Sequence, residues 1–161
     1  MGIIQKFGND FKGFSRKNDD EDVVIKANYF SAYKKKFVIK KAGFGDRSFN
    51  FIILFISRNL SAGDEASRDI VRHEYGHTIQ YDRLGPVAYY RHIGKPSMAS
   101  AVAGDLYYEQ PWEVFADVEG GVISRKHDEK TIQAGYDYLE SAAAKRGRLF
   151  GCGLCHHKDK D

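Results

Sequence analysis

The segment "DIVRHEYGHTIQYD", residues 69–82, carries the strongest signal in the chain. It places two histidines, His73 and His77, four residues apart, and Glu74 directly follows the first. Residues four apart on a helix share one face, with Cβ atoms about 5–6 Å apart, so both imidazoles can reach one zinc ion. Glu74 is turned by about 100° from His73 and reaches a water on the open side of the metal instead. The order His-Glu-x-x-His therefore predicts a zinc-binding helix with Glu74 as the general base.

The same segment also suits an ordinary amphipathic helix, because charged residues can fall at this spacing by chance. A catalytic zinc site needs a third protein ligand and an open fourth position, so the source of the third ligand separates the two interpretations. An extended motif would supply it with Gly at position 80 and His at position 83. The chain has Gln80 and Arg83 there, so the third ligand has to come from another element.

A second helix is the expected source of that ligand, and "PWEVFAD", residues 111–117, predicts one. Glu113 and Asp117 are four residues apart and therefore share a helical face. We expect Glu113 to be the third zinc ligand. We expect Asp117 to accept a hydrogen bond from the non-coordinating ring nitrogen of His73, which fixes the tautomer and orientation of that ring. Two rival carboxylates that do not belong to this Glu-x-x-x-Asp pair precede it in the sequence: Asp105 and Glu109.

Taken together, these residues resemble the site of the gluzincin-type metallopeptidases, a group of zincins. That group pairs HExxH with a downstream helix that carries Glu-x-x-x-Asp. The resemblance covers residues 69–121 and is carried by His73, Glu74, His77, Glu113 and Asp117. The wider stretch also resembles small bacterial HExxH domains, some of them attached to large repeat-bearing surface or toxin proteins.

The resemblance has three further implications. A strand should run beside the HExxH helix with its edge free to pair with an extended substrate, and residues 48–57 are the natural candidate. A Tyr or His should stabilise the oxyanion formed during peptide hydrolysis. The candidates are Tyr107, Tyr108 and His127, of which we single out Tyr108 and His127 as catalytic. Larger members of the group close the cleft with a second domain, for which this chain leaves little room.

Length and composition indicate one globular domain over residues 1–150. The chain has 161 residues, of which 42% are hydrophobic and 29% charged. The net charge of +3 is too small to favour binding to nucleic acid or to an anionic membrane. No apolar run approaches the ~20 residues of a membrane span, and the first residues lack the pattern of a signal peptide. We expect a cytoplasmic location by default, unless the sequence belongs to a larger exported protein.

Residues 151–161 are expected to form a flexible tail. Both cysteines of the chain, Cys152 and Cys155, lie there in "CGLCHH". The pattern C-x-x-C-H matches c-type haem attachment, and the same residues suit a second metal site or a redox pair. We favour the simpler interpretation, in which the thiols belong to a mobile end of the chain.

The remaining sequence predicts an α+β fold, in which a small antiparallel or mixed sheet packs against the HExxH helix and two to three further helices. Strands are predicted over residues 22–30, 35–44 and 48–57, the first two joined as a hairpin around "SAYK". Helices are predicted over residues 64–84, where Gly85 and Pro86 stop the first, and then over residues 97–104, 111–118 and 128–146.

The sequence thus predicts a zinc-dependent hydrolase, specifically a metallopeptidase with one catalytic zinc ion and a peptide or protein substrate. One alternative is a zinc-binding module that cleaves nothing. Another is a toxin or effector domain with the same chemistry. Glu74 favours the enzyme, because a purely structural zinc site has no need of it.

Overall fold

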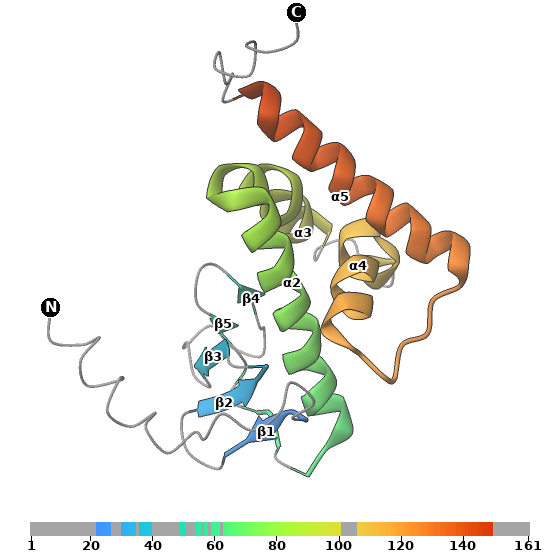
Figure 1. The fold of residues 1–161 in the computed structure, drawn as a ribbon. Helices are drawn as coiled ribbons and strands as arrows, with labels where there is room; N and C mark the ends of the chain where they lie inside the picture. The colour runs from blue at the N-terminus through green and yellow to red at the C-terminus, as the bar shows by residue number, and fades with distance from the viewer. Residues whose placement is uncertain are drawn as a thin grey trace, which may run out of the picture.

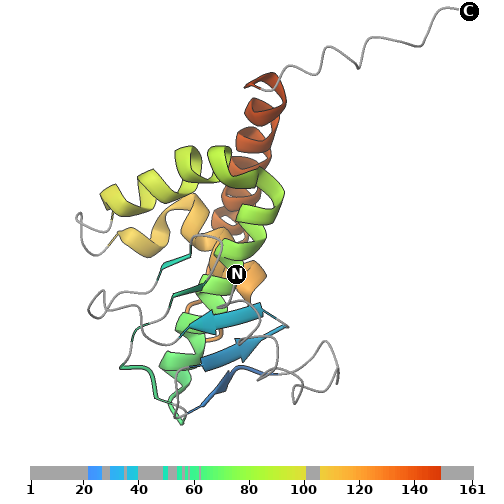
Figure 2. The ribbon, with the colours of Figure 1, turned by 90° about the vertical axis from the view of Figure 1, so that its left-hand side faces the viewer.

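The computed structural model describes residues 22–26, 30–34, 36–39, 49–50, 54–55, 57, 59–61, 63–100 and 106–149. Helix α2 (Glu65–Tyr89) runs through the centre of this part of the chain, with a small sheet on one side and helices α4 (Pro111–Gly120) and α5 (Glu129–Leu149) on the other (Figure 1). The view turned by 90° shows the same layers, with the sheet in front of α2 (Figure 2). The arrangement is an α+β fold, as the sequence predicts.

Within the described residues, the sheet has five strands in the order β1-β2-β3-β5-β4. Strand β1 (Val24–Ile25) pairs with β2 (Phe30–Tyr33), and β2 pairs with β3 (Lys36–Ile39), both antiparallel. The predicted hairpin is therefore present, but "SAY" belongs to strand β2 and the turn follows it at Lys34, whose φ is 43°. The first predicted strand is shorter than residues 22–30, because β1 ends at Ile25.

The prediction of one continuous strand over residues 48–57 is wrong. This segment contains two short strands, β4 (Phe49–Asn50) and β5 (Leu54–Phe55), which pair antiparallel with each other. Strand β5 also pairs with β3 in parallel, so the sheet is mixed and β4 forms one of its edges. An unbroken apolar run gives no period from which a reversal can be recognised, which is why the sequence suggested a single buried strand.

Helix α2 begins after Asp64, whose carboxylate accepts hydrogen bonds from the backbone N–H groups of Ala66 (3.3 Å) and Ser67 (3.1 Å). Its predicted end at Gly85 is a kink instead, where φ is 71° and ψ is 169°. The helical path resumes at Pro86, continues through the π-helix η1 (Tyr90–Gly94) and reaches α3 (Lys95–Ser100). Proline fits the first turn of a new helical segment because the N–H it lacks has no partner there.

Helix α4 starts with Pro111 in its first turn and ends before Gly121, which has the left-handed conformation (φ 81°, ψ 37°). The N–H of Val122 then bonds to the carbonyl of Asp117 at 2.9 Å, as in a glycine-terminated helix. Helix α5 begins after Asp128, which accepts a hydrogen bond from the N–H of Thr131 at 2.8 Å. Both helices agree with the predicted ranges to within three residues.

Two apolar clusters lie on opposite sides of α2. One, between α2 and the sheet, consists of Val23, Ile25, Tyr33, Val38, Leu60 and Val71. The other, between α2, η1, α4 and α5, consists of Leu84, Ala88, Tyr89, Ile93, Phe115, Leu139 and Ala142. The first cluster contacts α2 at Val71 in its N-terminal half, and the second contacts it at Leu84, Ala88 and Tyr89 near its C-terminal end, so α2 lies between two packed layers. Among the described residues, no helix combines the length and apolar character needed to cross a bilayer. The predicted tail with Cys152 and Cys155 lies outside the described residues.

Candidate metal centre

Helices α2 and α4 are in backbone contact through two glycines. A Cβ atom added at Gly76 of α2 would lie 2.0 Å from the carbonyl oxygen of Ala116, and one added at Gly120 of α4 would lie 2.0 Å from the carbonyl oxygen of Arg72. No side chain other than hydrogen fits at either position. This close approach brings the face of α2 that carries the two histidines against the face of α4 that carries Glu113 and Asp117.

Three side-chain atoms meet at this contact. The Nε2 atoms of His73 and His77 lie 3.1 Å apart, and Oε2 of Glu113 lies 3.0 Å from the first and 3.1 Å from the second. All three residues are buried, with Glu113 fully so. Neighbouring ligand atoms around a tetrahedral zinc ion with bonds of about 2.0–2.1 Å are about 3.3 Å apart. The three atoms are therefore spaced to hold a metal ion with little rearrangement.

A hydrogen bond from behind orients the ring of His73. Its Nδ1 lies 2.6 Å from Oδ1 of Asp117 on α4. Asp117 also accepts hydrogen bonds from Arg125 (Nε to Oδ2, 2.8 Å) and from Nε2 of His127 (2.9 Å). Burial alone would raise the pKa of Asp117, but the bonds from Arg125 and His73 outweigh it and lower that pKa. The ionised carboxylate can only accept, so Nδ1 of His73 carries a proton, and the neutral form of the ring has its lone pair on Nε2.

Two residues that the sequence did not point to support the other two members of the cluster. Oε1 of Gln80 lies 2.8 Å from Nδ1 of His77, and the hydroxyl of Ser97 donates to Oε1 of Glu113 at 2.6 Å. The available signal for Gln80 was its position three residues after His77 on the same helix. Ser97 had no such signal, because it reaches Glu113 only through the reversal of the chain after the kink in α2.

The cluster is electrostatically coupled. Burial would lower the pKa of His73, but hydrogen bonds to Asp117 and Glu113 raise it to about 9. Burial would raise the pKa of Glu113, but the two nearby histidines hold it well below its usual range. Burial raises the pKa of Glu74, which is itself buried next to the histidines in the sequence. A buried anion facing two rings in this way favours a cation at their meeting point.

The candidates for stabilising the oxyanion, Tyr107, Tyr108 and His127, each contact a different residue of the site. The ring of Tyr108 is half exposed and stands edge-on to that of His73, with centroids 5.7 Å apart, and the guanidinium of Arg125 lies 4.1 Å from its centroid. Burial raises the pKa of Tyr107, and a hydrogen bond to Glu113 adds to the effect. The ring of His127 bonds to the carboxylate of Asp117 and therefore lies next to that residue.

The two rival carboxylates do not join the cluster. Among the residues that the structure describes, the one group suited to a metal ion is formed by His73, His77 and Glu113. Glu109 is exposed and outside it, and Asp105 lies outside the described residues.

No protein-family model, curated protein or solved structure matches the chain. The identification of the site therefore depends on its own geometry.

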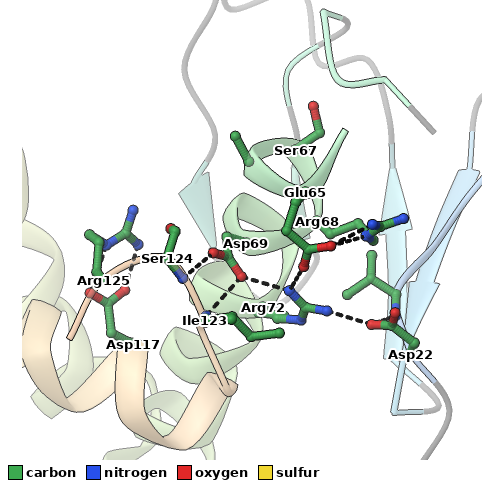
Figure 3. A network of polar contacts seen from close by, with 12 residues as sticks. Asp22, Glu65, Ser67, Arg68, Asp69, Arg72, Asp117, Ile123, Ser124 and Arg125 are labelled. Atoms are coloured by element: carbon green, nitrogen blue, oxygen red, sulfur yellow. Dashed lines mark hydrogen bonds and ion pairs between the residues drawn. The ribbon is translucent and has the colours of Figure 1, made fainter. Parts of the chain in front are cut away.

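A second network, centred on the buried residues Asp69 and Arg72, fixes the loop that follows α4 (Figure 3). Asp69 of α2 accepts hydrogen bonds from the backbone N–H groups of Ile123 (3.0 Å) and Ser124 (2.7 Å), and from Arg72 (2.7 Å). Arg72 also contacts Asp22, at 2.5 Å, and Glu65. The loop held in this way leads directly to Arg125 and His127, the partners of Asp117, so the network contributes indirectly to the orientation of His73.

Proposed function

We propose that the chain is a zinc-dependent hydrolase, specifically a metallopeptidase. Its zinc ligands would be His73, His77 and Glu113. The observation that carries the proposal is the convergence of three buried acceptor atoms within 3.0–3.1 Å of one another, on two helices. Each of the three side chains receives or donates a hydrogen bond on the side away from that point, which holds it ready for a cation.

The set of donors favours zinc. Two imidazoles with one carboxylate are the ligands of many hydrolytic zinc sites, and three protein ligands leave the fourth position open. When bound, zinc would act as a Lewis acid on the scissile carbonyl and lower the pKa of water to about 7. A structural site would be closed by a fourth ligand, and the described residues offer only three at this point.

Glu74 would transfer the proton. It follows His73 directly on the same helix and is buried. A general base works best when its pKa lies near the operating pH, and burial moves the pKa of Glu74 upward in that direction. Its carboxylate would accept the proton of the attacking water and return it to the nitrogen of the leaving amine.

The substrate would be an extended peptide. Strand β4 forms one edge of the sheet, and Figure 1 shows it near the middle of α2. A peptide that pairs with such an edge is held by its backbone, and its scissile bond can be presented to a neighbouring helix. Tyr108, half exposed beside the ring of His73, is the group we assign to the oxyanion. We assign His127 to the support of Asp117.

Metal analysis and one variant test the proposal. Purified protein supplied with zinc should bind one ion per chain and cleave members of a broad peptide library. Glu74→Gln should bind zinc equally well but cleave at least ~10²-fold more slowly, because only the proton acceptor is lost. Glu109→Gln is the matched control and should behave as wild type, since Glu109 is exposed and outside the cluster.

The outcomes separate the alternatives. A protein that binds no zinc would refute the metal centre and the enzyme together. A protein that binds zinc but is inert, with wild type and Glu74→Gln indistinguishable on every peptide, would indicate the zinc-binding module without catalysis. A toxin or effector domain would share the activity and differ only in the protein that delivers it.

A further inference from the structure

Gln80 is completely buried, and both ends of its side-chain amide are used. Oε1 lies 2.8 Å from Nδ1 of His77, and Nε2 donates to the backbone carbonyl of Trp112 at 2.6 Å. Trp112 directly precedes Glu113 in α4. The side chain therefore connects one histidine of α2 to the backbone beside the carboxylate on α4.

The chemistry of these contacts leaves one arrangement of protons. A backbone carbonyl can only accept, so the amide nitrogen of Gln80 must face Trp112. The amide oxygen then faces His77, and Nδ1 of that ring must carry a proton to donate to it. A neutral imidazole with its proton on Nδ1 has its lone pair on Nε2, the atom that lies 3.1 Å from Glu113.

We propose that Gln80 is a positioning residue of the metal centre, which fixes the tautomer of His77 and ties that ring to the backbone next to Glu113. The inference rests on the proposed function for the identity of the ion, but the tautomer is a property of the chain itself. Gln80 orients the ring of His77 as Asp117 orients the ring of His73, with one difference. Its neutral amide both accepts and donates, and so also joins the two helices that carry the ligands.

Two variants separate these roles. Gln80→Leu removes both hydrogen bonds, whereas Gln80→Glu keeps an acceptor for His77 and loses the donor to Trp112. Gln133→Leu is the matched control, because Gln133 is exposed on α5, its amide donates to Asp137 of the same helix at 2.8 Å, and neither residue belongs to the candidate metal centre. Circular dichroism and thermal unfolding would monitor the fold of each variant.

Two measurements read the result. Zinc affinity is measured by competition with a chromogenic chelator. The protonated nitrogen of His77 is identified by long-range ¹H–¹⁵N correlation spectra of the full chain, recorded with zinc and also without zinc over a pH series, at the alkaline end of which the spectra show that the ring of His77 has become neutral. The second condition tests Gln80 even if the wild-type protein were to bind no zinc.

We expect Gln80→Leu to bind zinc about 10- to 100-fold more weakly and to lose the single Nδ1–H tautomer of His77. Gln80→Glu should keep this tautomer but bind zinc at least ~10-fold more weakly, because the tie to α4 is broken. The control should match wild type in both measurements.

Three results would overturn the inference. One is a Gln80→Leu variant that retains the wild-type tautomer, whatever its affinity, since Gln80 would then contribute only packing. Another is zinc binding by Gln80→Leu within about twofold of wild type. The third is a mixture of tautomers in Gln80→Glu. If wild type binds no zinc, the proposed function fails, and the zinc-free spectra alone decide the role of Gln80.

Discussion

Replacing Gly76 by alanine should disrupt the proposed metal centre without touching any of its proposed ligands. The new Cβ atom would lie 2.0 Å from the carbonyl oxygen of Ala116, whereas ordinary contacts begin at 3.4 Å. Both helices meet here through rigid backbone, so neither side can rotate away. The helices would have to separate by about 1.4 Å, the difference between these two distances.

This separation has two measurable consequences. Overpacking of this kind costs roughly 1–3 kcal/mol, and the better helix propensity of alanine offsets up to about 1 kcal/mol of it. A net loss of about 1–2 kcal/mol lowers the melting temperature of a chain of this size by about 2–8 °C. Metal–ligand distances tolerate only about 0.2 Å, so the displacement of Glu113 from the two rings should weaken zinc binding by at least ~100-fold.

Gly63→Ala is the matched control for both measurements. Gly63 precedes α2, and a Cβ atom there meets nothing within 4 Å. Zinc affinity by chelator competition and melting temperature by circular dichroism should therefore match wild type. If Gly76→Ala had the zinc affinity and melting temperature of Gly63→Ala, the close contact of the helices could not be what places Glu113 at the site.

Three other predictions follow from the same geometry. Asp117→Asn should weaken zinc binding by about 10- to 100-fold, because a neutral amide cannot accept the bonds from both His73 and Arg125 as the carboxylate does. An affinity equal to wild type in chelator competition would contradict this role. Addition of zinc at about 100 times its dissociation constant should stabilise the chain by about 3 kcal/mol and raise its melting temperature by about 5–10 °C, and a chelator should reverse this; an unchanged melting temperature would argue against binding to the folded state. Hydrogen bonds from Ser124, Ile123 and Arg72 outweigh burial and lower the pKa of Asp69 from 3.8 to about 2, so its stabilisation is complete above about pH 4 and disappears as the pH falls towards 2. In denaturant titrations, the free energy of unfolding should fall between pH 4 and pH 2 by about 2 kcal/mol less in Asp69→Asn than in wild type. In Asp137→Asn, at an exposed position, it should fall as in wild type.

The sequence could predict the parts of the site that depend on helical spacing. His73, His77, Glu113 and Asp117 each follow from residues four apart, and the period of a helix is encoded locally. That the two helices meet at these residues is not local. It depends on Gly76 and Gly120. In a sequence, a glycine inside a helix indicates a lower helix propensity and does not indicate a contact with a second helix.

Other features could not be predicted because they depend on long-range contacts. The apolar run 49–56 gave no sign that β4 and β5 pair with each other, because the pairing partner of a strand depends on contacts outside its own sequence. Gly85 and Pro86 did indicate a break in the helix, but not that the path resumes as a helix whose residues Tyr89 and Ile93 pack in the second apolar cluster. Gln80 drew attention only as the residue that breaks a longer histidine motif.

The hydrogen bond from Ser97 has a consequence for the denticity of Glu113. Because Oε1 is engaged by the hydroxyl, only Oε2 faces the histidines, and the carboxylate would bind through a single oxygen. A chelating carboxylate would take an additional coordination position. A serine on α3, brought back by the kink in α2, would thus keep that position accessible to solvent or substrate, and the reactivity of the ion would depend on a residue that never touches it.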